Sequence, residues 1–191
     1  MGIDPRIERA RRVLLARIAS YGYTHLSAVG GVIYTYTLGL PAYARHPELV
    51  VCGVPPDEAI PILGDVVRLL TDSARALDGR VMGLLEDDTP LWVAPIPEAT
   101  VASQLSAASW WRKEHHDGTP AAAKQIIFPD AARRFPWQAG CDPDLRALQS
   151  LLLPEIAVRE PDVGLSRPGD AARCTRNLRR EESVRRRRPR R

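Results

Sequence analysis

His46 and Glu48 are the two side chains of this 191-residue chain whose types and spacing best suit acid–base chemistry. They lie in the sequence RHPEL, at the entry to an apolar run. A histidine there could act as a general base or as a ligand-binding group, with the carboxylate as its partner. His-Pro is also a common turn, and Glu48 could instead pair with Arg45. Both residues are therefore candidates for a catalytic role, and the structural alternative stays open.

The run VIYTYTL, at residues 32–38, offers a second kind of site. Alternation along a strand separates Val32, Tyr34, Tyr36 and Leu38 from Ile33, Thr35 and Thr37. Tyrosine and threonine hydroxyls could hold a small ligand over a sheet, but both residue types are also good strand formers. Tyr36 and Thr37 are thus candidates for ligand binding.

No motif of the chain predicts a metal or a nucleotide site. His115 and His116 are adjacent, so on a helix their side chains would point roughly 100° apart, and the spacing of a zinc helix is missing. We expect a solvated helix end there and no metal. The sequence also has no phosphate-binding glycine loop and no serine elbow. It identifies no cofactor, although flavin is conceivable by analogy with small antiparallel barrels.

The segment PDAARRFPWQAGCDPD, at residues 129–144, places two aromatic residues around a proline. Phe135 and Trp137 could fold back over the sheet as the wall of a pocket, or they could form a structural plug. Burial of such rings is worth several kcal/mol at about 25 cal/mol per Å² in either case.

A single α+β domain must position these residues. The periodicity of apolar residues predicts helices over residues 5–21, 56–77, 98–115 and 143–152, and strands over 23–29, 32–38, 48–54, 80–85, 91–96 and 122–128. Gly30 and Gly31 join the first two strands as a hairpin. This order lacks a regular β-α alternation, so we expect an antiparallel or mixed sheet with helices packed on it.

Charge divides the chain into two parts. Residues 167–191 hold eleven arginines against three acidic residues, a net charge of +8, so residues 1–166 carry −4. We expect a domain over residues 1–160 and a disordered basic tail over 161–191, because the tail has too few large apolar residues to form a core.

The remaining composition suggests an ordinary protein of the cytoplasm. No apolar run approaches the length that spans a membrane, and the N-terminal segment does not resemble a secretory signal. The three cysteines are far apart in the sequence, so we expect no disulfide framework and a buried, inert thiol at Cys52.

Three motifs together resemble the bacterial family called domain of unknown function 4262. They are YTLGL at residues 36–40, HPEL at 46–49 with GVP at 53–55, and Gln125 followed by Pro129-Asp130 and FPW at 135–137. The resemblance covers roughly residues 8–152 and implies candidate ligand-binding positions, but no reaction. These positions are Tyr36, Thr37, Gly39, His46, Gln125, Asp130 and Trp137. The family usually has a glycine two residues before its FPW, where this chain has Arg133.

Three functions remain open at this point. The first is a domain that binds a small ligand or cofactor between the YTLGL strand, the HPE loop and the FPW loop. The second is a protein-interaction module without catalytic activity. The third is association with nucleic acid through the arginine-rich tail. The oligomeric state and the biological process are not indicated by the sequence.

Overall fold

The computed structural model describes residues 4–28, 32–73, 77–83, 88–149 and 152. The helices are α1 (Pro5–Tyr21), α2 (Leu40–Ala44), α3 (Pro56–Ser73), α4 (Glu98–Gln104), α5 (Ser106–His115) and α6 (Pro143–Leu148). The strands are β1 (Thr24–Ala28), β2 (Tyr34–Leu38), β3 (Glu48–Cys52), β4 (Gly79–Val81), β5 (Leu91–Pro95) and β6 (Ala123–Ile127). The glycine turn at 30–31 and the predicted tail at 161–191 lie outside the described residues.

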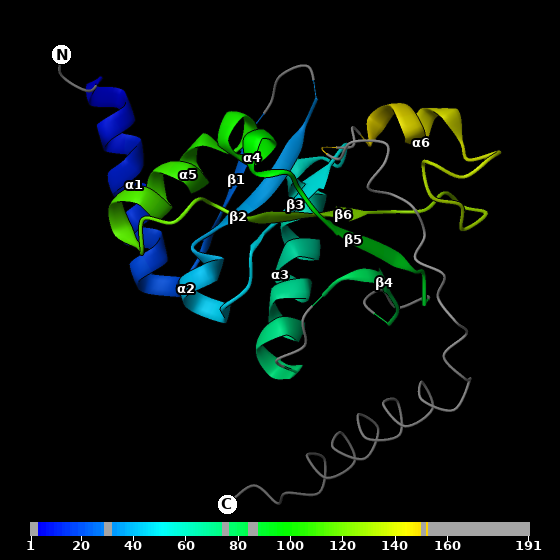
Figure 1. The fold of residues 1–191 in the computed structure, drawn as a ribbon, viewed down its shortest axis with the longest axis horizontal. Coiled ribbons are helices and arrows are strands. Elements are labelled where there is room, and N and C mark those ends of the chain that lie inside the picture. Colours follow the sequence, from blue (N-terminus) through cyan, green and yellow to red (C-terminus); the bar gives the residue numbers. More distant parts are fainter. Residues whose placement is uncertain (1–3, 29–31, 74–76, 84–87, 150–151, 153–191) are drawn as a thin grey trace, which may run out of the picture. The chain divides into compact units, whose positions relative to one another are not determined.

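Six strands form one mixed sheet in the order β1-β2-β3-β6-β5-β4 (Figure 1). The first two strands form the predicted antiparallel hairpin, with Leu26 opposite Tyr36. The central pair, β3 and β6, is parallel, and the other neighbouring pairs are antiparallel. The prediction of an α+β domain with an antiparallel or mixed sheet is therefore confirmed.

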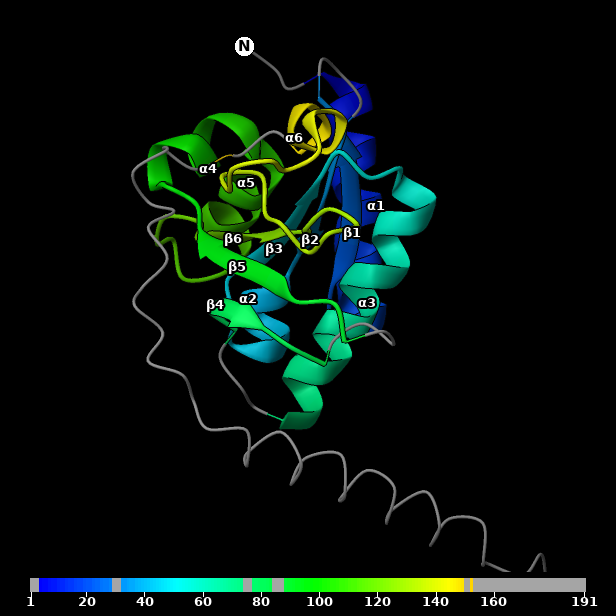
Figure 2. The same cartoon turned by 90° about the vertical axis from the view of Figure 1, so that its right-hand side faces the viewer.

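Two apolar cores lie on the two faces of this sheet. Helix α3 and the start of α2 cover one face, through side chains that include Leu40, Leu63 and Val67. Helices α4 and α5 cover the other face with Val101, Leu105 and Trp111, and α1 packs against the same core. Figure 2 shows α3 and the pair α4 and α5 on opposite sides of the sheet.

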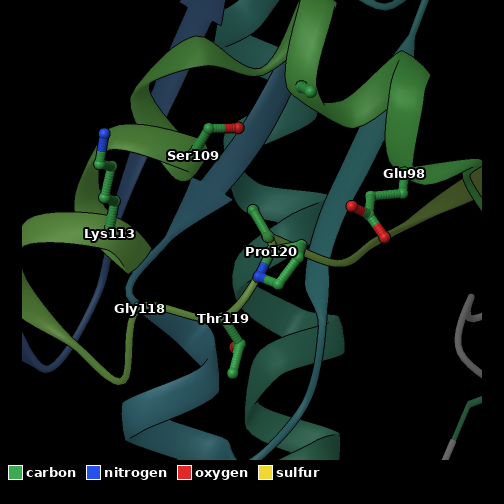
Figure 3. A pocket seen from close by; sticks show the side chains of 8 residues that line it. Glu98, Ser109, Lys113, Gly118, Thr119 and Pro120 are labelled. Atoms are coloured by element: carbon green, nitrogen blue, oxygen red, sulfur yellow. The ribbon is translucent and has the colours of Figure 1, made fainter.

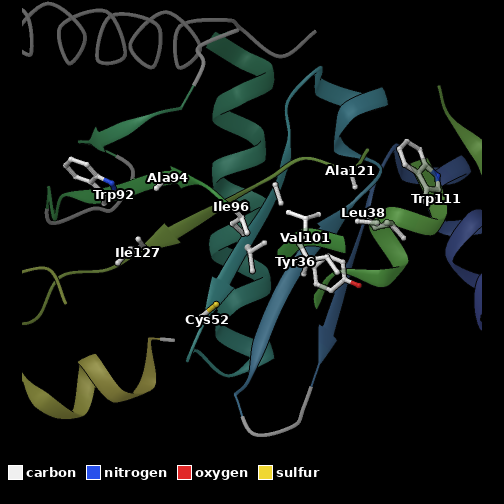
Figure 4. Packing of buried hydrophobic residues seen from close by; sticks show 14 of the residues in the cluster. Tyr36, Leu38, Cys52, Trp92, Ala94, Ile96, Val101, Trp111, Ala121 and Ile127 are labelled. Carbon is white, nitrogen blue, oxygen red and sulfur yellow. The ribbon is translucent and has the colours of Figure 1, made fainter. Parts of the chain in front are cut away.

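The second of these cores follows the predicted alternation of residues 32–38. Tyr36 and Leu38 are buried in it (Figure 4), and the partly buried Tyr34 packs against it. Cys52 lies in the same core and is 1% exposed. The prediction of a buried cysteine is therefore confirmed, and burial raises the pKa of its thiol to about 12, which supports the prediction that it is unreactive.

Local capping explains where several helices begin. The Asp4 carboxylate accepts a hydrogen bond from the backbone N–H of Arg6 (2.8 Å), and Pro5 occupies the first turn of α1. The Asp142 carboxylate likewise accepts from Asp144 N (2.8 Å) at the start of α6. Both helices therefore begin where the Asp-Pro pairs predict.

Two predictions about helices were wrong. Residues 98–115 do not form one helix, because the backbone leaves the helical region at Leu105, where φ is −109° and ψ is 55°. The side chain of Leu105 is fully buried, so the break turns it into the core. The five-residue helix α2 stands where the sequence predicts only a turn.

Among the described residues, no helix is both long and apolar enough to cross a membrane.

Gly53 marks a close approach of two backbones just beyond β3. Its φ is +72°, and a Cβ atom built there would lie 2.0 Å from the carbonyl oxygen of Leu148 in α6. The N–H of Gly53 also donates to Ile33 O (2.8 Å), which keeps this backbone beside β2. No other residue type fits this position without displacing α6.

We therefore expect Gly53→Ala to lower the free energy of unfolding by about 2 kcal/mol or more, from backbone strain together with the clash. Gly64→Ala is the matched control, because a Cβ atom added to Gly64 in α3 would have no neighbour within 4 Å. There the same change should stabilise the helix by up to about 1 kcal/mol. Urea denaturation of both variants tests this, and equal stabilities would contradict it.

Candidate functional site

The carboxylate of Glu48 joins the end of β2, the start of α2 and the start of β3. The hydroxyl of Thr37 donates to Glu48 Oε2 (2.6 Å). The backbone N–H of Gly39 donates to Oε1 (2.8 Å), and that of Leu40 donates to Oε2 (3.3 Å). Thr37 Oγ1 in turn accepts from the N–H of Leu49 (2.9 Å). One buried side chain thus fixes three consecutive elements.

Gly39 is required for this geometry. Its φ is +102°, a conformation that side-chain-bearing residues rarely adopt. A Cβ atom there would lie 3.1 Å from Gly22 O and 3.3 Å from the Ile18 side chain. The glycine of the YTLGL motif therefore turns the backbone so that two successive N–H groups point at one carboxylate.

Burial dominates the electrostatics of Glu48, which is 0% exposed. It raises the pKa of the carboxyl group to about 7, although the bonds from Thr37, Gly39 and Leu40 and the charge of Arg112 act in the opposite direction. Burial also raises the pKa of the Tyr36 hydroxyl well above its usual range, and the nearby Tyr34 and Glu48 add to this effect. Glu48 forms no ion pair with Arg45 in the part of the chain that the structure describes.

His46 is also buried, but it does not hydrogen-bond Glu48. Its Nδ1 lies 2.8 Å from Pro47 O, so Nδ1 carries the proton and donates. Its Nε2 is buried without a hydrogen-bond partner among the described residues. Burial lowers the pKa of His46, and the nearby Lys124 lowers it further, while the bond to Pro47 O and the charge of Asp78 oppose this. The imidazole is therefore neutral at pH 7.

Asp130 organises the loop that follows β6. Its carboxylate accepts from the backbone N–H groups of Ala132 (2.9 Å), Arg134 (2.8 Å) and Asp142 (3.1 Å). It also accepts from Arg134 Nε (3.0 Å). A side chain with this many backbone partners serves to shape the loop.

The two aromatic rings of the FPW motif pack on β5. Phe135 and Trp137 stack with their centroids 4.9 Å apart and their planes at 3°. Trp137 also meets the edge of Trp92 in β5 at 5.5 Å. Phe135 is a core residue, and Trp137 packs against the same core. The indole Nε1 of Trp137 is buried without a hydrogen-bond partner among the described residues. For Phe135 and Trp137, this packing favours a structural plug over the wall of a pocket.

Gln125 lies in the middle of the sheet, on β6, between β3 and β5. Its Oε1 accepts from the N–H of Leu152 (2.8 Å). Gln149 makes a similar link to Phe128: its Oε1 accepts a hydrogen bond from the N–H of Phe128, and its Nε2 donates one to the carbonyl oxygen (2.9 Å each). Both glutamines therefore attach the chain beyond α6 to the sheet.

The seven candidate positions thus fall into separate groups. Because β3 and β6 are parallel, Glu48 and Ala123 begin their strands at one end of the sheet, and the loop after β6 lies at the other end. Thr37, Gly39 and His46 belong to the first end, whereas Asp130 and Trp137 belong to the second. The parallel pairing separates the HPE loop from the FPW loop, so a pocket shared by both is not supported.

An open surface cavity of about 280 Å³, most of whose lining residues are exposed, lies near the first end, between α4, α5 and the segment that leads into β6 (Figure 3). Ser109 and Lys113 extend from α5 and Glu98 from α4, and Gly118, Thr119 and Pro120 form the other side. Ala102 and Ala121 complete the lining. No pattern in the sequence singles out these residues, because they come from three separate segments and form no motif.

Arg112 connects this cavity to the buried carboxylate. Its guanidinium donates to Asp117 (3.0 Å) and contacts the hydroxyl of Thr119, which lines the cavity. Its positive charge also acts on Glu48, and the N–H of Glu48 donates to Ala122 O (3.0 Å), next to the cavity wall. The inner wall of the cavity is therefore held by the same end of the sheet that Glu48 organises.

The raised pKa of Glu48 makes stability depend on pH. A carboxyl group that binds its proton more tightly in the folded chain stabilises the fold fully below the unfolded value, near 4.5, and this contribution is lost as pH rises through about 7. We therefore compare the free energies of unfolding of the native chain and the Glu48→Gln variant. The native value minus the variant value should decrease by up to about 3 kcal/mol between pH 4.5 and 8. Urea denaturation at several pH values measures this difference.

Glu58→Gln is the control for this test, because it removes a carboxylate from the exposed first turn of α3. The difference in free energy of unfolding between the native chain and Glu58→Gln should show no comparable dependence on pH. A Glu48→Gln difference that does not change with pH would refute the assigned role of burial.

Arg133 adopts the left-handed backbone conformation, with φ at 62°. This conformation suits glycine, the residue that the resemblance implies at this position, and we expect Arg133→Gly to raise the free energy of unfolding by up to about 1 kcal/mol. Ala131→Gly, in the same loop and not among the residues with positive φ, should instead be neutral or destabilising. Thermal denaturation of the two variants compares them, and a destabilised Arg133→Gly protein would contradict this explanation.

Comparisons with known proteins agree with the resemblance seen in the motifs. Searches of curated proteins and of solved structures gave no match. The family model described as a domain of unknown function, DUF4262, matches residues 17–142, which include the YTLGL, HPE and FPW motifs. The chain therefore belongs to the DUF4262 family.

Proposed function

We propose that this domain binds a small polar molecule in the cavity between α4, α5 and residues 118–121. The supporting observation is that an ammonium group, a carboxylate and a hydroxyl from two helices, those of Lys113, Glu98 and Ser109, line one open concave surface. None of these three side chains has a hydrogen-bond or ion-pair partner among the described residues. They therefore have unused bonding capacity for a ligand.

The lining indicates the chemistry of that ligand. Lys113 suits a carboxylate or phosphate, and Glu98 suits an ammonium or hydroxyl donor. Ala102, Pro120 and Ala121 offer a short apolar surface between them. A volume of about 280 Å³ is close to the lower end of ordinary ligand pockets, which favours a compact metabolite over a flavin nucleotide. An amino acid or a hydroxy acid satisfies all these requirements.

This proposal keeps the ligand-binding function expected from the sequence and changes its location. The YTLGL and HPE segments support the wall of the cavity through Glu48 and Arg112, and they do not line it. The FPW loop belongs to the opposite end of the sheet. The alternative of a protein-interaction face formed by the HPE loop and the FPW loop has less support, because the two loops lie at opposite ends of the sheet and the Trp137 ring packs against the core.

A thermal-shift panel of free amino acids, hydroxycarboxylates and sugar phosphates tests the proposal. A ligand present at about 100 times its dissociation constant should stabilise the protein by about 2.7 kcal/mol, which is readily detected. Native mass spectrometry then gives the stoichiometry, expected to be one ligand per chain.

Ser109→Leu should abolish the shift, because its larger side chain fills the cavity. Ser106→Leu is the matched control on the same helix, since Ser106 is exposed and does not line the cavity, and it should retain the shift. No shift with any member of the panel, or a shift that survives in Ser109→Leu, would refute the proposal.

A further inference from the structure

The N-terminal helix α1 has a charge opposite to that of the domain to which it belongs. Residues 4–21 contain five arginines against Asp4 and Glu8, a net charge of +3. Residues 22–166 contain eleven basic and eighteen acidic residues, a net charge of −7. The small net charge of the domain is therefore the sum of a basic helix and an acidic remainder.

The inner face of α1 is occupied by the fold. Leu14, Leu15 and Ile18 in the middle and second half of the helix pack against the core, while Ile7 and Tyr21 near its two ends are 51% and 72% exposed. Arg11 is also engaged: it lies 3.8 Å from a carboxylate oxygen of Glu114 and 4.5 Å from the centre of the Trp110 ring. Both partners belong to α5, which holds α1 in place.

The other four arginines are exposed and have no acidic partner within 4.0 Å in the described structure: Arg6, Arg9, Arg12 and Arg17. At 100° per residue they lie within the half of the helix that faces away from the core. The first and the last are about 16 Å apart along the helix axis, at about 1.5 Å per residue. We call these four residues the arginine face.

We propose that the arginine face binds the phosphate backbone of double-stranded nucleic acid. Guanidinium groups suit phosphate oxygens because they donate two parallel hydrogen bonds and stay charged. A row of four uncompensated charges about 16 Å long can contact several successive phosphates of one strand. Such contacts carry no sequence information, so we expect binding without sequence preference.

The remaining surface favours this occupant over an anionic membrane. A helix that lies in a membrane interface buries a broad apolar face in it, whereas in α1 Leu14, Leu15 and Ile18 pack against the core and leave only separated apolar side chains, such as Ile7, exposed. On the outer side, Val13 is 49% exposed and stands among arginines. The acidic charge elsewhere on the domain repels phosphate groups in other orientations. At the arginine face this repulsion is weak, because salt screens charges that are more than about 8 Å away.

This surface is distinct from the proposed ligand cavity. The model of the family matches from residue 17 onward, so Arg6, Arg9 and Arg12 precede the matched range. The inference thus concerns this chain and does not extend to the family.

Fluorescence anisotropy with a labelled 20-bp DNA duplex tests the inference on the full chain at 50–200 mM salt. The variant is Arg9→Gln with Arg12→Gln, at the centre of the face. Losing two phosphate contacts should weaken binding about tenfold or more at 100 mM salt and reduce the salt slope by about 2. The matched control, Arg68→Gln with Arg80→Gln, removes the same charge from exposed positions on α3 and β4 and should change affinity less than twofold.

Circular dichroism confirms that both variants remain folded. Equal loss in the two variants would assign binding to net charge alone, and unchanged binding in the α1 variant would assign it to the arginine-rich tail; either result overturns the proposal. No binding by the native chain at 50 mM salt overturns it as well. So does binding to vesicles of phosphatidylserine and phosphatidylcholine in the absence of DNA binding.

Discussion

Glu48 is an ionisable side chain buried completely at the junction of two strands and a helix. Burying a carboxyl group without partners would cost several kcal/mol, so its donors must be in place whenever the domain is folded. Those donors are the hydroxyl of Thr37 and two successive backbone N–H groups at Gly39 and Leu40. The need to satisfy one carboxylate therefore determines where β2 ends, how the chain turns and where α2 begins.

The position of β3 follows from the same constraint. The N–H of Glu48 donates to Ala122 O, so the start of β3 is fixed beside the start of its parallel neighbour β6. The segment that leads into β6 also lines the cavity, and Arg112 links that segment to the buried charge. Ala122 adjoins the cavity lining at Ala121, so the backbone bond of Glu48 also positions the segment that forms this wall.

The sequence contains enough information for the hairpin, for most strands and for the capped helix starts, because alternation, glycine turns and Asp-Pro pairs act within a few residues. Other features depend on distant partners. The helix α2 has only five residues and is stabilised by a carboxylate that follows it, and the break at Leu105 is a response to the core. The pairing of β3 with β6 joins segments about 75 residues apart, which no local pattern predicts.

The same distinction explains why the site differs from the motifs. The sequence indicates four candidates because their side chains can do chemistry: His46, Glu48, Gln125 and Asp130. In the structure, the hydrogen bonds described for the last three are made largely with the backbone of this chain. A polar group whose bonds are made inside the fold has little left for a ligand. In the described part of the chain, unpaired polar groups remain on two motif residues, at His46 Nε2 and Trp137 Nε1, and also on residues that no motif marks, at Glu98, Ser109 and Lys113 in the cavity and on the exposed arginines of α1. In this domain, the carboxylates and Gln125 of the recognisable motifs position backbone segments of the fold.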